Sequence, residues 1–196
     1  MACQSYQTWK SKAIALNRSF LPDRLMITEK LIRDIRHQFR INWSGIHGIS
    51  HWARVHENGM KLADLTGANK TVVQFFSVFH DSCRHNEGSD PCHGARGAEL
   101  ARQFRSTHHK HLLDKDFELL YTACRLHTSA DTHEDITIQT CFDSDRLDLG
   151  RVGTIPDPRY LCTDAAKSPE MISWALDNSE YGRIPQNTLG RFVLNN

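Results

Sequence analysis

The chain has no C-x-x-C pair, no apolar stretch long enough to cross a bilayer and almost no net charge. Its six cysteines are scattered over 196 residues, and a chain of this size does not need disulfides to fold, so we expect reduced thiols. The longest mainly apolar run, residues 71–79, is far shorter than the ~20 residues of a membrane-spanning helix. Residues 1–12 contain no hydrophobic signal-peptide segment. We therefore expect a cytoplasmic protein with no membrane contact.

The charge balance argues against one large class of partner. The 24 Lys and Arg stand against 23 Asp and Glu, which gives a net charge of +1. Binding along a nucleic-acid backbone needs a basic field, so we expect no extended nucleic-acid surface. The chain also lacks the G-x-x-x-x-G-K-[ST] phosphate loop and the G-x-S-x-G nucleophile motif. A small or localised anionic substrate fits this composition better.

Amphipathic helical patterns follow one another along the chain and predict an all-α bundle. We expect a single domain over residues 1–196, with a core at 47–153 on which a helix at 23–40 and an irregular tail at 154–196 pack. Asp23 and Ser50 are the expected N-caps of the first two helices. The predicted helices cover about residues 23–40, 50–67, 71–83, 93–104, 116–127 and 136–150, and a short one in the tail covers 169–176.

A His-Asp pair, His80 and Asp81, follows directly on the most apolar helical run. Burying such a pair is costly unless a partner compensates, and a bound cation would supply one. His51 and Asp145 would complete a set of two imidazoles and two carboxylates, which suits Mn, Ni, Co, Zn or Fe and leaves positions open for water and substrate. Taken singly, each residue is more simply a satisfied core or surface group, and Asp145 can pair with the adjacent Arg146.

Taken in order, His51, His80, Asp81 and Asp145 resemble the metal-ligand pattern of the HD superfamily of metal-dependent phosphohydrolases. The local sequences HWARV, FHDSCR and DSDRLD around these residues are similar to the family's first, signature and last helices. The resemblance covers about residues 47–153. It implies an HD-domain-like helical bundle whose metal activates water to hydrolyse a nucleotide or a related phosphate ester. It also implies that Asp143 lies behind the ligands, because Asp145 precedes the Arg-Leu pair.

The same resemblance suggests roles for residues near the metal. Asp81 can accept a proton from the attacking water, and the guanidinium groups of Arg54 and Arg84 are suited to phosphate oxygens. His93 and His127 would line the substrate site, and His127 would protonate the leaving group. Two simpler readings concern the arginines. Arg84 can be a solvated loop charge, and Arg54 can pair on the surface with the acidic residues Glu57 or Asp64.

Several alternatives to a one-metal enzyme stay open. Some members of the superfamily bind a second metal through added histidines, and His93 and His127 stand at suitable places for a two-metal phosphodiesterase, although the usual His-His pair is missing. The chain can instead bind a nucleotide and signal without turnover. It can also be a helical interaction protein that binds no metal. The cluster His108, His109 and His111 is expected at a solvated helix end without a role.

Overall fold

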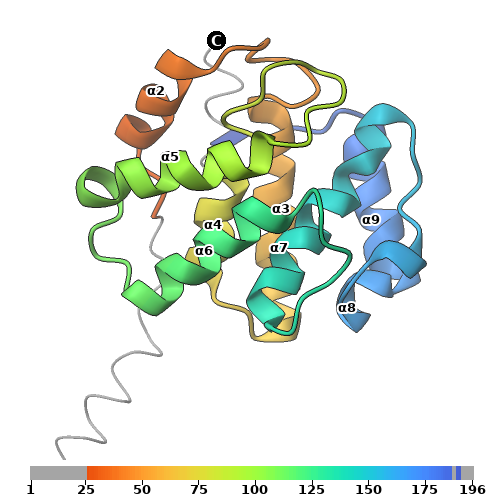
Figure 1. The fold of residues 1–196 in the computed structure, drawn as a ribbon. Coiled ribbons are helices and arrows are strands. Elements are labelled where there is room, and N and C mark those ends of the chain that lie inside the picture. The colour runs from red at the N-terminus through yellow and green to blue at the C-terminus, as the bar shows by residue number, and fades with distance from the viewer. Residues whose placement is uncertain (1–25, 187–188, 191–196) are drawn as a thin grey trace, which may run out of the picture.

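The computed structural model describes residues 26–186 and 189–190, and every regular element within them is helical. The predicted all-α bundle is confirmed (Figure 1). No helix in these residues is long and apolar enough to cross a membrane. The main helices are α2 (Glu29–Gln38), α3 (Ile49–Thr66), α4 (Lys70–Phe79), α5 (His93–His108), α6 (Asp114–Leu126), α7 (Ile136–Arg146), α8 (Asp164–Lys167) and α9 (Pro169–Glu180).

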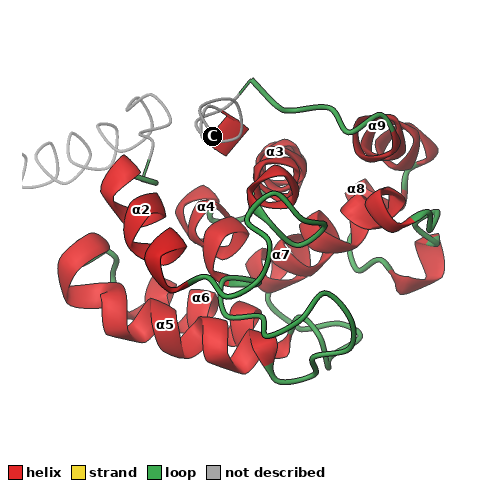
Figure 2. Cartoon of the chain, turned by 90° about the horizontal axis from the view of Figure 1, so that it is seen from above, coloured by secondary structure: helices red, strands yellow, loops and turns green. Residues whose placement is uncertain are grey.

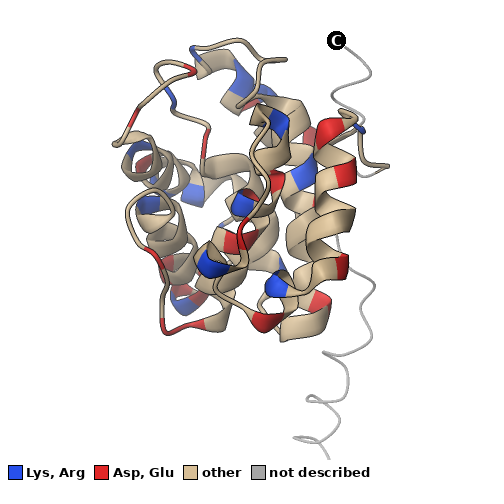
Figure 3. Cartoon of the chain, turned by 90° about the vertical axis from the view of Figure 1, so that its right-hand side faces the viewer, with Lys and Arg blue, Asp and Glu red and all other residues tan. Residues whose placement is uncertain are grey.

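Helix α3 lies at the centre of the arrangement and packs against both α4 and α7. Helices α5 and α6 pack against each other and cover α4 from one side. Seen from above, α2 lies on one side of α3, and α8 and α9 lie on the other (Figure 2). On the side drawn in Figure 3, basic and acidic residues are mixed over the helices, in keeping with the small net charge.

Helix α4 is buried around most of its surface, as its apolar sequence predicts. Its N-cap Asn69 accepts hydrogen bonds from the backbone amides of Thr71 and Val72. Nearly every side chain after Thr71 is buried, including those of Phe75, Phe76 and Phe79. Each buried phenylalanine contributes about 2–3 kcal/mol of transfer free energy. Because the helix ends at Phe79 inside the core, the next two residues, His80 and Asp81, also lie in the interior.

Two predicted helix starts need correction. Helix α2 begins at Glu29, where the Thr28 hydroxyl accepts a hydrogen bond from the Leu31 amide, and the predicted cap Asp23 lies outside the described residues. Helix α3 begins at Ile49 after Gly48, so the prediction of Ser50 as its cap was wrong. A β-carbon on Gly48 would stand 2.0 Å from the Trp43 carbonyl oxygen. A tight loop therefore sets the start of α3, rather than a capping side chain.

The C-terminal tail is more helical than its prolines suggested. Helix α9 begins at Pro169 as predicted, but it extends to Glu180 instead of ending near Leu176. The tail also contains α8 and a 3₁₀ helix, η2 (Pro158–Tyr160). A small second cluster of apolar side chains attaches it to α3 and to the 3₁₀ helix η1 (Leu147–Val152). Its buried members are Leu62, Leu147, Leu161, Ala166, Met171 and Ala175.

Gly97 permits the close crossing of α5 over the end of α4. A β-carbon there would lie 2.2 Å from the Phe79 carbonyl oxygen and 3.0 Å from that of His80, and backbone atoms cannot move aside cheaply. Gly97→Ala should therefore lower the free energy of unfolding by about 1–3 kcal/mol, measured by urea denaturation. Gly88→Ala is the control, because its added carbon meets only the Asn86 side chain at 3.5 Å. Equal midpoints for the two variants would contradict the close packing.

Candidate metal centre

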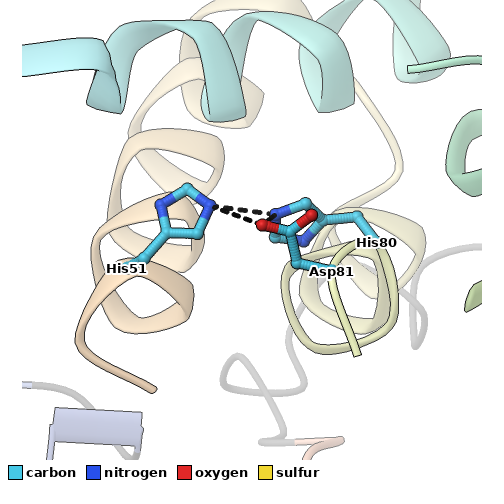
Figure 4. A group of neighbouring side chains, drawn as sticks. All are labelled: His51, His80 and Asp81. Carbon is cyan, nitrogen blue, oxygen red and sulfur yellow. Dashed lines mark hydrogen bonds and ion pairs between the residues drawn. The ribbon is translucent and has the colours of Figure 1, made fainter. Parts of the chain in front are cut away.

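The predicted ligands His51, His80, Asp81 and Asp145 lie close together; the first three are buried and are drawn in Figure 4, whereas Asp145 is partly exposed. The Nε2 atom of His51 lies 3.1 Å from Nε2 of His80, 3.6 Å from Oδ2 of Asp81 and 3.3 Å from Oδ1 of Asp145. Nε2 of His80 lies 3.7 Å and 3.9 Å from the same two oxygens. Atoms that share a metal at ~2.1 Å stand roughly 3.0–3.4 Å apart. The observed spacing is close to this range.

The hydrogen bonds of the two histidines fix which ring nitrogen carries the proton. Nδ1 of His51 lies 2.6 Å from a carboxylate oxygen of Asp148, and Nδ1 of His80 lies 3.1 Å from the Phe76 carbonyl oxygen. Since these oxygens only accept, each Nδ1 must donate, and in the neutral ring Nε2 keeps its lone pair. Two such lone pairs face each other at 3.1 Å. A cation between them would relieve the repulsion.

Burial affects the protonation states of these side chains. It lowers the pKa of His80 to about 3, and the His80 ring is therefore neutral at physiological pH. Burial opposes ionisation of Asp81 and Asp145, but contacts with the imidazoles outweigh it and hold the pKa of both carboxyl groups below their usual range. Two carboxylates and two imidazole rings match the donor set of a divalent transition metal. The Asp145 side chain is 21% exposed, which leaves this side of the group open.

A second group of possible ligands shares Asp81. The other carboxylate oxygen of Asp81, Oδ1, lies 2.9 Å from Nε2 of His93, which lies 2.9 Å from Nε2 of His127. Their Nδ1 atoms are held by the backbone carbonyl oxygens of Asp90 and Cys124, at 2.6 Å and 2.7 Å. The three potential ligand atoms lie within 4.8 Å of one another. Asp81 therefore faces two adjacent groups of histidines with its two oxygens.

Arg84 lies beside the second group and is only 6% exposed, so the alternative of a solvated loop charge was wrong. Its Nη1 lies 3.4 Å from Oδ1 of Asp81 and 3.3 Å from the ring nitrogens of His93. Its Nη2 donates to the Gly88 carbonyl oxygen at 2.6 Å. The guanidinium thus brings a fixed positive charge to the second group and anchors the loop that follows α4.

Asp148 is a residue of the site that sequence reasoning missed. Its carboxylate accepts from Nδ1 of His51 at 2.6 Å and from Nε and Nη2 of Arg54 at 2.6 Å and 3.1 Å. Arg54 is buried in this pair, so its alternative surface partners Glu57 and Asp64 were wrong. Its predicted contact with substrate phosphate stays a prediction. In the sequence, the one indication that Asp148 belongs to the site was its position three residues after Asp145.

Asp148 should orient His51 for metal binding, because a carboxylate on the distal nitrogen fixes the ring and raises its basicity. We expect Asp148→Asn to weaken metal affinity by about 10–100-fold, measured by titration of the metal-free protein. Asp143→Asn is a matched control. That buried carboxylate accepts from the backbone amides of Cys162 and Thr163, at 2.7 Å and 2.8 Å, and so ties α7 to the tail. Equal affinity losses in both variants would refute the orienting role.

The histidine cluster after α5 lies away from these groups, and its expected solvation was partly wrong. His109 is fully buried between the rings of Phe75, Phe79 and Phe117. Nε2 of His108 lies 2.8 Å from a carboxylate oxygen of Asp34. The polar sequence around His109 gives no indication that this ring is buried in the core. The five cysteines in the described residues are free, as predicted.

Comparison with known proteins found no relative of this chain. No family model matches the chain, and neither a curated protein nor a solved structure matches it. The structure itself supports an all-helical bundle with buried His/Asp groups that can hold a metal ion.

Proposed function

We propose that the chain is a metal-dependent phosphohydrolase of the HD type, acting on a nucleotide or a related phosphate ester. The observation that carries the proposal is the convergence of the His51 and His80 Nε2 atoms with carboxylate oxygens of Asp81 and Asp145. The order of these residues along the chain is that of the HD pattern, which ties the metal site to phosphate-ester chemistry. The exposed side of Asp145 leaves access for a substrate.

A divalent transition metal bound by these four residues would act as a Lewis acid and activate water for attack on phosphorus. Asp81 is placed to accept a proton, because its two oxygens face both groups of histidines. Arg84 would hold positive charge beside the reacting phosphate, although its other donors hold the backbone. For Arg54, the pair with Asp148 favours a positioning role over substrate binding.

The proposed role of His127 as a proton donor has less support than its role in lining the substrate site. Its Nδ1 proton is held by the Cys124 carbonyl oxygen, and burial lowers the pKa of the ring. The neutral ring therefore presents a lone pair, not a proton, toward His93. This arrangement suits a metal ligand or an acceptor of substrate hydrogen bonds.

The test is to strip the untagged protein of metal, reload it separately with Mn, Fe, Co, Ni or Zn, and assay phosphate release from a panel of nucleotides. We expect tight binding of at least about one ion per chain and metal-dependent hydrolysis. Metal binding with tight nucleotide binding but no turnover would instead support a signalling module. Failure to bind any of the five metals would overturn the proposal.

A two-metal phosphodiesterase is the second candidate, favoured by the way Asp81 faces both groups of histidines. Against it stands Arg84, which already supplies a cation at Oδ1 of Asp81. The metal content of the reloaded protein separates the two candidates, since the second requires about two ions per chain. His93→Ala should then remove one ion and activity toward a generic phosphodiester, whereas a one-metal protein should keep its full metal content.

A further inference from the structure

A polar pocket of about 440 Å³ opens beside the candidate metal centre. His127 lines it, and the ring of His127 lies 5.4 Å from that of His80, measured between centroids. Thr128 and Ser129 line the pocket from the chain that follows α6, whereas Tyr160 lines it from η2 in the tail. A substrate whose phosphate lies at the metal centre can therefore extend into a space formed partly by the tail.

A second, mainly apolar pocket of about 310 Å³ adjoins the first, because Arg146 and Tyr160 line both. Ile155 and Pro156 are among its other lining residues. Ile155 and Tyr160 are 66% and 67% exposed, so they offer apolar surface to a ligand in this pocket. Tyr160 thus lines both the polar and the apolar pocket.

The arginines that line the pockets are engaged by the protein itself. Nη1 of Arg146 donates to the carbonyl oxygens of Asp131 and Tyr160, both at 2.7 Å, and its Nη2 donates to that of Ala130 at 2.6 Å. Arg159 forms two hydrogen bonds to one carboxylate oxygen of Asp157, at 3.0 Å and 2.6 Å. Hydrogen-bond donors of both arginines are therefore already engaged by the protein. The pockets suit an uncharged group with hydroxyls and a flat ring better than additional phosphates.

Resting on the proposed phosphohydrolase function, we propose that these adjoining pockets bind the nucleoside part of a nucleoside monophosphate. The sugar hydroxyls hydrogen-bond to polar side chains of the first pocket, for which Thr128, Ser129 and Asp131 are available. The base stacks on Tyr160 and reaches the apolar pocket, since aromatic side chains are common platforms for bases. Together the volumes suit a ligand of this size, for which sites span about 300–1,000 Å³. Nucleoside di- and triphosphates bind less well, because Arg146 and Arg159 already donate to carbonyl oxygens and to Asp157 and would have to give up these bonds to receive further phosphates.

The test compares Tyr160→Ala and Tyr160→Phe with the unchanged, metal-loaded protein by calorimetric titration with nucleoside monophosphates and with ribose 5-phosphate. We expect Tyr160→Ala to raise the Kd for the nucleotide about tenfold, Tyr160→Phe to restore it, and neither to change the Kd for ribose 5-phosphate. The same change should appear in KM for the nucleotide, with kcat nearly unchanged. Tyr181→Ala is the control, because that tyrosine is also exposed but lies just past the end of α9 and lines neither pocket.

Two results would overturn the pocket assignment: equal Kd values for the nucleotide and ribose 5-phosphate in the unchanged protein, or equal effects of Tyr160→Ala and Tyr181→Ala. Nucleotide binding that depends on Tyr160 but leads to no hydrolysis would support the pocket and contradict the phosphohydrolase. Hydrolysis of the nucleotide that Tyr160→Ala does not affect would support the phosphohydrolase and contradict the pocket assignment. The binding and turnover measurements thus separate the two proposals.

Discussion

Replacement of Asp81 with alanine should remove the metal and lower the rate of phosphate-ester hydrolysis by at least about a thousandfold. Asp81 contacts both groups of histidines, with Oδ2 at 3.6 Å from Nε2 of His51 and Oδ1 at 2.9 Å from Nε2 of His93. Its loss takes a ligand from the proposed site and leaves Arg84 without its carboxylate partner. Elemental analysis and phosphate release should be measured on the same untagged preparation.

Asp64→Ala is a suitable control for this experiment, because that carboxylate is exposed on α3 and forms an ion pair with Lys70 at 2.7 Å. Folding should be checked in the metal-free proteins. There the loss of Asp81 leaves the buried Arg84 without its carboxylate partner, which lowers stability by itself, so metal content is compared only between variants that remain folded at the assay temperature. A variant that keeps both its metal and its turnover would show that the centre lies elsewhere.

The sequence indicated the core of this site because part of its energetics is local. An ionisable pair at the end of a buried helix is visible without tertiary structure, and His80 and Asp81 follow such a run. His51 and Asp145 were predicted as ligands from their order along the chain relative to His80 and Asp81. Asp148 was missed because it is separated from His51 by 97 residues in the sequence. The contact between them also depends on the change from α7 to a 3₁₀ helix at Leu147. No periodic pattern of apolar residues in the sequence indicates that change.

The fold was predictable for a similar reason, since the helical periods of the apolar residues are local and strong. The sequence predictions failed at positions where tertiary packing determines the local structure. The start of α3 is set by the approach of Gly48 to a carbonyl oxygen, and burial of His109 depends on rings from α4 and α6. The polar sequence around His109 favours solvent. Contacts with the rings of Phe75, Phe79 and Phe117 reverse that preference.

The burial of His109 predicts a pH-dependent contribution to stability. Desolvation lowers its pKa from 6.5 to about 4 in the folded protein; nearby His108, His111 and Arg105 lower it further, while the Ala101 carbonyl opposes them. Between these two pKa values the unfolded chain binds the proton more tightly than the folded one. Stability is therefore fully present above pH 6.5 and falls as the pH drops toward 4, by up to about 3 kcal/mol.

His109→Phe removes this titration and keeps an aromatic ring beside Phe117, with which His109 stacks at an interplanar angle of 18°. Urea denaturation of the metal-free proteins at several pH values between about 7 and 4.5 should show a smaller stability loss for the variant, by about 2–3 kcal/mol. His111→Phe is the control, because His111 contacts Phe75 but is exposed. Working without metal keeps ion release at low pH out of the comparison. Parallel stability curves for the unchanged protein and His109→Phe would mean that His109 is protonated as readily in the folded chain as in the unfolded one.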